Sequence, residues 1–245
     1  MRDKAFKVVL LCACGVVLCI ILAMLYTLFA WSFPVLKGGT LSATLLLYES
    51  YVIGTFASAG LAVLLSVLFS LSIASLTVEY YHGRCISRWI KHLLIICRNI
   101  PSIIWGIGAF YILPDKGFFT IVFVLTIMIT PYASSWVAAA MDNVSISIRE
   151  SAYSLGATST AVLGKIIIPA AGKGILAAYA LAFVKALGET MIIAVFAGNT
   201  ITGGLLHSFS THTIHPVWGV LALGLFLVTT GINGIASSIL YKYIR

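Results

Sequence analysis

Two ionisable residues, Lys185 and Glu189, lie four positions apart inside one apolar stretch of this 245-residue sequence. Ionisable side chains inside a membrane span are costly, and they commonly mark a substrate or ion pathway. Positions four apart share one face of a helix, and lysine before glutamate is the weaker order for local stabilisation. Two interpretations compete: a neutralised pair that holds helices in register, and a polar lining of a solute path. The residue order favours the polar lining.

A third ionisable residue, Arg98, opens the apolar stretch that contains Pro101. An arginine near the end of a span can extend its charge to the lipid headgroups. Pro101, however, interrupts helical hydrogen bonding, and irregular backbone at membrane depth belongs inside protein or beside a water-filled cavity. The positive charges of Arg98 and Lys185 would attract an anion, and the negative charge of Glu189 would weaken that attraction. Such a balance suits the passage of an anion, because conduction requires sites that bind weakly.

The composition indicates the environment in which these charged residues lie. Hydrophobic residues make up 61% of the chain and charged residues 9%, whereas soluble domains carry about 25% charged residues. The chain is therefore predicted to be an integral membrane protein. A net charge of +8 would suggest nucleic acid for a soluble protein. Here the basic residues flank apolar runs, so membrane topology explains them and no nucleic-acid partner is expected. The five cysteines show no metal-binding spacing and are interpreted as small apolar residues.

Six stretches reach the roughly 20 apolar residues that a helix needs to cross a bilayer. The first is longer than the apolar region of a signal peptide, so we expect an uncleaved anchor. Of the 15 Lys and Arg residues, eleven fall on one side of a six-span arrangement and two on the other. By the positive-inside rule, both termini and the loop around Arg149 face the cytoplasm. The predicted spans cover residues 8–33, 52–78, 93–113, 118–139, 174–197 and 217–241.

Small residues recur along two of these spans, where they predict close helix contacts. The second span has a small residue at every fourth position, and the last span carries four glycines. The residues are Ala62, Ser66, Ser70 and Ala74 in the second span, and Gly219, Gly224, Gly231 and Gly234 in the last.

The loop over residues 141–173 is the longest predicted cytoplasmic connection, and its pattern indicates two short helices. Gly156 would end the first helix, because glycine adopts the left-handed conformation easily. Ser159 or Thr160 would cap the second helix, which would run to about residue 167, and Pro169 would mark the turn back to the membrane. The loop could rest on lipid headgroups or dock into a cytoplasmic ATPase. The apolar side of the first helix would comprise Ile146, Ile148, Ala152 and Leu155.

This loop resembles the EAA motif of ATP-binding-cassette (ABC) importer permeases, and the match favours the docking interpretation. Ser151 replaces the first alanine of the motif and Ile168 replaces a leucine. The resemblance implies an all-α membrane protein with the six-span type I (MetI-like) permease fold, formed by one domain over residues 1–245. It also implies that an ATPase contacts the loop through Glu150, Ser151, Ala152, Gly156, Ile166 and Pro169.

Two further strings resemble Pst-type phosphate permeases. Residues 185–190 resemble their Arg-Ala-x-Gly-Glu-Thr signature, with lysine in place of arginine, and residues 98–106 resemble their Arg-x-x-Pro-Ser-x-x-x-Gly segment. Met191 and the following Gly198-Asn199 favour the C-type half over the A-type half. The resemblance implies a phosphate path lined by Arg98, Asn99, Ser102, Lys185, Glu189 and Thr190. The alternatives are another solute (molybdate, phosphonate or an amino acid) and a membrane assembly protein without transport activity.

The family also implies partners. The chain has no GxxxxGK[ST] phosphate loop, so ATP and Mg are expected on two ATPase subunits, and neither cofactor nor enzymatic activity is expected here. A second permease chain, related rather than identical, and an external phosphate-binding protein complete the expected assembly, together with lipid of a prokaryotic inner membrane. His207, His212 and His215 fit no rigid metal site and are expected to contact an external partner.

Overall fold

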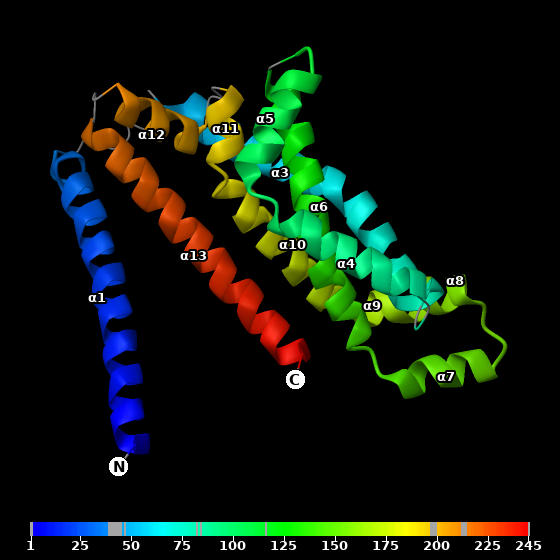
Figure 1. Cartoon of the computed structure of the whole chain (residues 1–245). Coiled ribbons are helices and arrows are strands. Elements are labelled where there is room, and N and C mark those ends of the chain that lie inside the picture. The colour runs from blue at the N-terminus through cyan, green and yellow to red at the C-terminus, as the bar shows by residue number, and fades with distance from the viewer. Residues whose placement is uncertain are drawn as a thin grey trace.

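The computed structural model describes residues 2–38, 46, 48–81, 83, 85–115, 117–196, 200–211 and 215–244. Within these ranges the regular elements are all helical (Figure 1). The membrane-sized helices are joined by short helical segments, two of which, η1 and η2, are π-helical. In chain order the elements are α1 (Arg2–Lys37), α3 (Glu49–Ser75), η1 (Leu76–Tyr80), α4 (Cys85–Asn99), α5 (Ser102–Ile112), α6 (Phe118–Asp142), α7 (Ile146–Ser154), α8 (Ser159–Val162), η2 (Leu163–Ile167), α9 (Ile168–Ala170), α10 (Gly172–Leu187), α11 (Met191–Phe196), α12 (Ile201–Ser210) and α13 (Pro216–Ile244).

Four helices are long and apolar enough to cross a bilayer: α1, α3 with η1, α6 and α13. Two further helix pairs reach that length only together, and each is sharply bent. The pair α4 and α5 is bent by 89°, and residues 159–170 are bent by 71° from α10. The structure thus has four to six candidate spans. The fifth predicted stretch follows α10 only as far as Leu187 and then continues through a break into α11, whereas the other five lie on these elements. The third and fifth predicted spans are not single helices, because the chain breaks at residues 100–101 and after Leu187.

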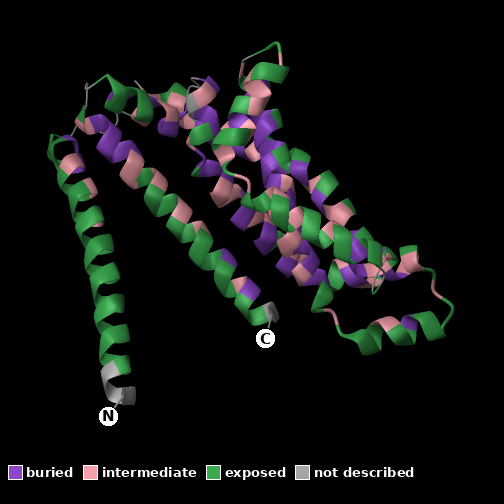
Figure 2. Cartoon of the chain, viewed as in Figure 1, coloured by how far each residue is buried: buried purple, intermediate pink, exposed green. Residues whose placement is uncertain are grey.

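The core lies where α3 crosses α6 and α10, and Figure 2 shows buried residues concentrated there. The four small residues of the second span, from Ala62 to Ala74, are all completely buried. The Thr126 hydroxyl of α6 donates to the Ala62 carbonyl at 3.4 Å, and the Ser70 hydroxyl lies 3.0 Å from that of Tyr179 on α10. The prediction of a close helix contact along this stripe is confirmed.

The glycines of α13 behave differently from one another. A Cβ atom on Gly219 would lie 3.1 Å from the Trp31 ring of α1, so this glycine permits close packing. On Gly224, Gly231 and Gly234 a Cβ atom would meet nothing within 4 Å. For these three residues the prediction of a helix contact within the chain is wrong, because α13 packs against α10 through other residues, Ala236 and Leu240 among them.

The short connecting helices lie towards two ends of the molecule (Figure 1). Figure 1 shows α7 at the same end as the beginning of α1 and the end of α13. The short helices α11 and α12 lie at the opposite end, with the connection from α5 to α6. The loop that resembles the EAA motif therefore occupies the end of the molecule at which the chain begins and finishes.

Gly204 of α12 provides a test of how α12 packs against α13. A Cβ atom there would overlap the indole of Trp218, which is 7% exposed and contacts Tyr48 and Tyr51 edge-on. We expect Gly204→Ala to lower the free energy of unfolding by about 1–3 kcal/mol, the usual cost of overpacking. Thermal unfolding of the detergent-purified chain measures this. Gly15→Ala, on the exposed helix α1 with nothing within 4 Å, is the matched control; equal melting temperatures for the two variants would contradict the packing.

Candidate functional site

The first short helix of the loop, α7, ends as the sequence predicts. Gly156 adopts a φ of +78°, in the left-handed region. Its N–H donates to the Tyr153 carbonyl at 2.9 Å, and the Ala157 N–H donates to the Ala152 carbonyl at 3.1 Å. These two bonds form a Schellman motif, which satisfies the last carbonyl groups of a helix. The prediction that Gly156 terminates the helix is confirmed.

The second short helix begins one residue earlier than predicted. The hydroxyl of Thr158, rather than that of Ser159 or Thr160, accepts the Ala161 N–H at 3.4 Å. Thr158 is the residue with extended backbone, and the N-cap requires that conformation. The helical segment then continues to Ala170 and carries Ile166, half-buried, and Pro169, exposed. The bend towards α10 comes at Ala171, two residues after Pro169.

The predicted apolar side of α7 does not pack against the bundle as a unit. Ala152 is 8% exposed and packs against residues of α3, α6 and η2. Ile146, Ile148 and Leu155, in contrast, are 66%, 48% and 88% exposed. These three residues therefore leave apolar area open to lipid or to a partner, the two alternatives that the sequence left open for this loop. Glu150 and Ser151 are exposed beside them.

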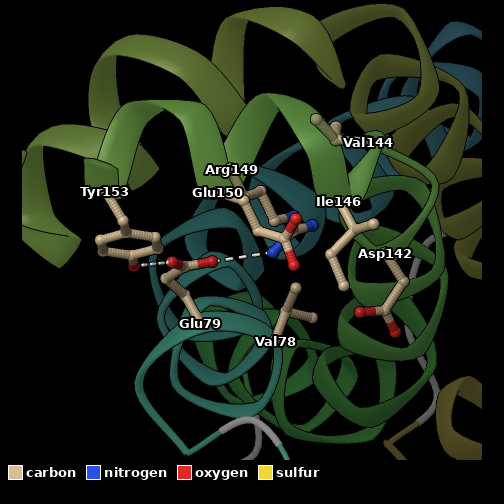
Figure 3. A pocket seen from close by; sticks show the side chains of 8 residues that line it. All are labelled: Val78, Glu79, Asp142, Val144, Ile146, Arg149, Glu150 and Tyr153. Atoms are coloured by element: carbon tan, nitrogen blue, oxygen red, sulfur yellow. Dashed lines mark hydrogen bonds and ion pairs between the residues drawn. The ribbon is translucent and has the colours of Figure 1, made fainter. Parts of the chain in front are cut away.

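The polar cluster joins α7 to the end of the second span (Figure 3). Arg149 donates from Nη1 to Oε2 of Glu79 at 2.8 Å and from Nη2 to the Met141 carbonyl at 2.6 Å. The Tyr153 hydroxyl donates to Oε1 of the same carboxylate. The side chains of Arg149 and Glu79 are 12% and 4% exposed. Glu150 joins these residues in lining a cavity of about 310 Å³.

Burial of the Tyr153 hydroxyl, followed by its hydrogen bond to Glu79, raises the pKa of Tyr153 above its usual value of 10.0. The hydroxyl is therefore protonated at neutral pH and can donate. Sequence reasoning used Arg149 only as a topological charge and missed Glu79 and Tyr153. The available signal was Glu79 itself, one of seven acidic residues in the chain, placed directly after an apolar span.

Lys185 and Glu189 do not lie on one helical face, so that prediction is wrong. Lys185 is in the last turn of α10, which ends at Leu187, and Glu189 lies in the break before α11. The half-buried ammonium of Lys185 lies 5.5 Å from the ring centroid of Tyr132, within reach of a cation–π interaction. Among the described residues, the ion pairs within 4.0 Å are Lys91–Asp142 and Arg149–Glu79, so Lys185 and Glu189 form no neutralised pair.

Glu189 is held by its backbone. Its N–H donates to the Ala186 carbonyl and its own carbonyl accepts from the Thr202 hydroxyl, both at 3.2 Å. The residue is 8% exposed, and Thr190 beside it is half-buried. The predicted path residues on this side therefore lie at a helix break that α12 supports.

The other predicted path residues lie at the bend between α4 and α5. Arg98 and Asn99 end α4 and are exposed, and Ser102 begins α5 and is half-buried. Arg98 lines a cavity of about 290 Å³ with Lys91. Within the described ranges, no hydrogen bond or ion pair joins Arg98 to Lys185 or Glu189.

The two breaks are nevertheless connected through α5 and α11. Gly106 of α5 is buried against α11, where a Cβ atom would lie 3.3 Å from the Ile192 backbone and 3.2 Å from Val195. Gly106 is the last residue of the segment that begins at Arg98. Its lack of a side chain allows the helices that follow the two breaks to pack closely.

Several predicted features lie beyond what the structure describes. His212, Gly198 and Asn199 are outside the described residues, as are the topological charges Arg84, Lys116 and Arg245. His207 and His215 are exposed, at the end that carries α12. Among described residues, no three His, Cys, Asp or Glu side chains are grouped to hold a metal ion.

Discontinuous helices beside helices long enough to cross a bilayer are typical of membrane transport proteins. Residues 66–244 match the family described as the binding-protein-dependent transport system inner membrane component. The match covers more than half of the chain, and the chain therefore belongs to this family.

Curated relatives and solved structures agree with this assignment. A phosphate transport system permease protein PstC of Mesorhizobium japonicum is 27% identical, over 70% of this chain and 59% of the relative. PstC of Haemophilus influenzae is 30% identical, over 61% of this chain and 56% of the relative. The chain thus spans less than two thirds of the length of either. An inward-facing structure of the MetNI methionine ABC transporter shares the fold, with a TM-score of 0.66, 20% identity and coverage of 80% of this chain and 95% of that chain.

Gly156 permits a test of the loop. We expect Gly156→Ala to destabilise the local turn by about 1–2 kcal/mol, because the left-handed conformation places Cβ too close to the following carbonyl oxygen. Limited proteolysis of the purified chain should then cleave residues 154–160 faster. Gly164→Ala, in η2 with nothing within 4 Å, is the control, and Gly156→Asn should recover part of the loss. Equal cleavage of the two alanine variants would contradict the assigned role of Gly156.

Proposed function

We propose that this chain is the permease subunit of an ABC importer for inorganic phosphate. The observation that carries the proposal is the pairing of two features in one fold. An exposed α7 carries Glu150, and two helix breaks carry Arg98 and Lys185. The first feature suits a subunit driven from outside the membrane, and the second suits a polar path through it. The names of the PstC relatives support phosphate as the substrate.

The charge distribution supports a cytoplasmic position for α7. The segments rich in Lys and Arg include the start of the chain, the Arg149 loop and the end of the chain, which lie towards one end of the molecule (Figure 1). The positive-inside rule places that end in the cytoplasm. The opposite end, with α11, α12, His207 and His215, would then meet the external phosphate-binding protein.

The exposed side of α7 provides the contact for an ATPase. Ile146, Ile148 and Leu155 expose apolar area beside the carboxylate of Glu150. An amphipathic helix that presents such residues fits into an apolar groove, and its charge selects a complementary partner surface. Ala152 holds the inner side of α7, while Ile166 and Pro169 belong to the segment that leads to α10. Two ATPase subunits would bind and hydrolyse ATP with Mg.

The helix breaks provide sites for the anion. A lysine ammonium is a compact point charge, so Lys185 on the Tyr132 ring can attract a phosphate oxygen without a bidentate grip. Glu189 opposes that attraction, which keeps the site weak enough for release. Arg98, Asn99 and Ser102 form the second site at the other break. Arg98 is exposed within this single chain, so a second, related permease chain would shield it from lipid and close the path.

In this mechanism, ATP binding draws the two ATPases together and moves the α7 helix of each permease chain. The movement reaches α10 through the segment from Thr158 to Ala171 and separates the α10 helices. Phosphate delivered at the opposite end then passes Lys185 and Arg98 and leaves on the cytoplasmic side. C-type character is supported by the PstC relatives.

The ATPase contact can be tested by reversing one charge. We expect Glu150→Arg to reduce co-purification of the transporter's ATPase by about tenfold or more, because like-charge juxtaposition at an interface costs several kcal/mol. Glu49→Arg, an equally exposed change at the start of α3, is the control and should leave co-purification unchanged. Wild-type chain that captures no ATPase at all would contradict the importer function and favour an assembly protein.

The substrate path requires a separate measurement. We expect Lys185→Ala combined with Glu189→Ala to reduce phosphate uptake by about tenfold or more, because an interaction with a charged group contributes about 1.5–3 kcal/mol. Lys185→Arg keeps the charge and should retain uptake. Uptake of radiolabelled phosphate into proteoliposomes is measured for both variants. Competition by molybdate, phosphonate and an amino acid tests which solute the path accepts. Full phosphate uptake by the double alanine variant would show that these residues do not line the path.

A further inference from the structure

We propose that Glu79, Arg149 and Tyr153 form a latch that fixes α7 to the second span and transmits its movement into the bundle. The inference rests on the proposed function, in which an ATPase moves α7. It concerns positioning residues, none of which is expected to touch the anion. Figure 3 shows the three side chains meeting between α7 and the turn that follows α3.

The latch dominates the attachment of α7. Ala152 is the one buried residue among the nine of this helix. The residues on either side, from Asn143 to Ser145 and from Leu155 to Thr158, are exposed or half-buried. Burial of an alanine side chain contributes little to the attachment of a helix, because its apolar area is small. The buried carboxylate of Glu79 supplies the directional contact that Ala152 cannot.

The geometry of the latch fixes orientation as well as position. Arg149 and Tyr153 lie four residues apart, so they project from one face of α7. They occupy the two different oxygens of the Glu79 carboxylate, Oε2 and Oε1. Two contacts from one helix to one carboxylate resist rotation of α7 about its axis. The second bond of Arg149, to the Met141 carbonyl at 2.6 Å, ties the same guanidinium to the end of α6.

Glu79 stands where a force on α7 would enter the bundle. It belongs to η1, which continues α3 directly, and the Thr77 carbonyl of η1 accepts a hydrogen bond from Ser87 of α4 at 2.9 Å. Further along α3, Ser70 is hydrogen-bonded to Tyr179 of α10. The helix α10 carries Lys185 near its end. A continuous set of contacts therefore leads from α7 through α3 to the helix that holds the proposed anion site, alongside the covalent route through α8 and α9.

Because the Arg149–Glu79 ion pair is buried, it would resist separation when an ATPase moves α7. Exposed ion pairs contribute little, and Lys91–Asp142, at 47% and 43% exposure, is of this kind. Arg149 and Glu79 are shielded from water, so separating them leaves a charge without a partner in a poorly solvated site. The hydroxyl of Tyr153, itself 40% exposed, occupies the carboxylate oxygen that Arg149 leaves open and so adds a second contact to the shielded pair.

The test compares coupling with assembly in the complete transporter in proteoliposomes. We expect Glu79→Gln to retain ATPase binding and ATP hydrolysis but to lower the phosphate transported per ATP by about tenfold, a usual size for lost coupling between sites. Tyr153→Phe, which keeps the ion pair, should lower it less. Glu49→Gln, at the start of the α3 helix that η1 continues, and Tyr80→Phe, one residue from Glu79, are the matched controls and should match the wild type.

Hydrogen–deuterium exchange gives a second readout. Residues 146–154 should exchange faster in Glu79→Gln and Tyr153→Phe and at the wild-type rate in both controls. Should Glu79→Gln fail to assemble, Tyr153→Phe alone decides. An unchanged phosphate-to-ATP ratio in the assembled variants would overturn the latch, as would a loss in which ATP hydrolysis and uptake fall in parallel. A wild-type chain that binds no ATPase would instead overturn the proposed function, so the two failures are distinguishable.

Discussion

The architecture depends on the requirement that every backbone N–H and C=O group at membrane depth has a partner inside the protein. Unbroken helices without an internal proline, such as α3, meet this requirement internally, but the broken segments cannot. At the break after α10, the Glu189 carbonyl is paired with the Thr202 hydroxyl. The Ile201 N–H at the start of α12 donates to the Thr55 hydroxyl of α3 at 2.8 Å. The polar backbone at this break is therefore satisfied by side chains of α3 and α12.

Features that depend on local chemistry could be predicted from the sequence. The apolar runs located the four helices long enough to cross a bilayer, Gly156 ended α7 because of its backbone freedom, and the small residues from Ala62 to Ala74 marked the α3 contact. Features that depend on the bundle could not. Apolar composition does not distinguish a straight span from a bent one, so the break after Leu187 was missed and Lys185 and Glu189 were assigned to one face. Glu79 lies 70 residues from Arg149, and no spacing rule connects them.

The residues that the sequence predicted to be functional fall into two groups, those of the loop and those of the solute path. The loop residues lie close together in the chain, on short helices between residues 146 and 170 whose buried residues join one cluster with residues of η1 and α6. Arg98 and Lys185 stand on separate elements, and the nearest connection between their neighbourhoods is the contact of Gly106 with α11. Residues close together in the sequence therefore predicted the loop well. The geometry of a solute path could not be predicted in this way, because it depends on helices that folding and a second chain bring together.

The hydroxyl groups along α3 have a consequence for how the bundle can deform. Ser58, Ser66 and Thr77 each donate to a carbonyl three or four residues earlier in the same helix. These hydroxyl groups therefore bond within α3 and η1, and few side-chain hydrogen bonds cross from α3 to its neighbours, those with Thr126, Tyr179 and the Ile201 N–H. A smooth surface of small side chains can slide by a fraction of a helical turn without exposing an unpaired polar atom. Shear between packed helices, rather than hinge bending, is the deformation that this interface favours.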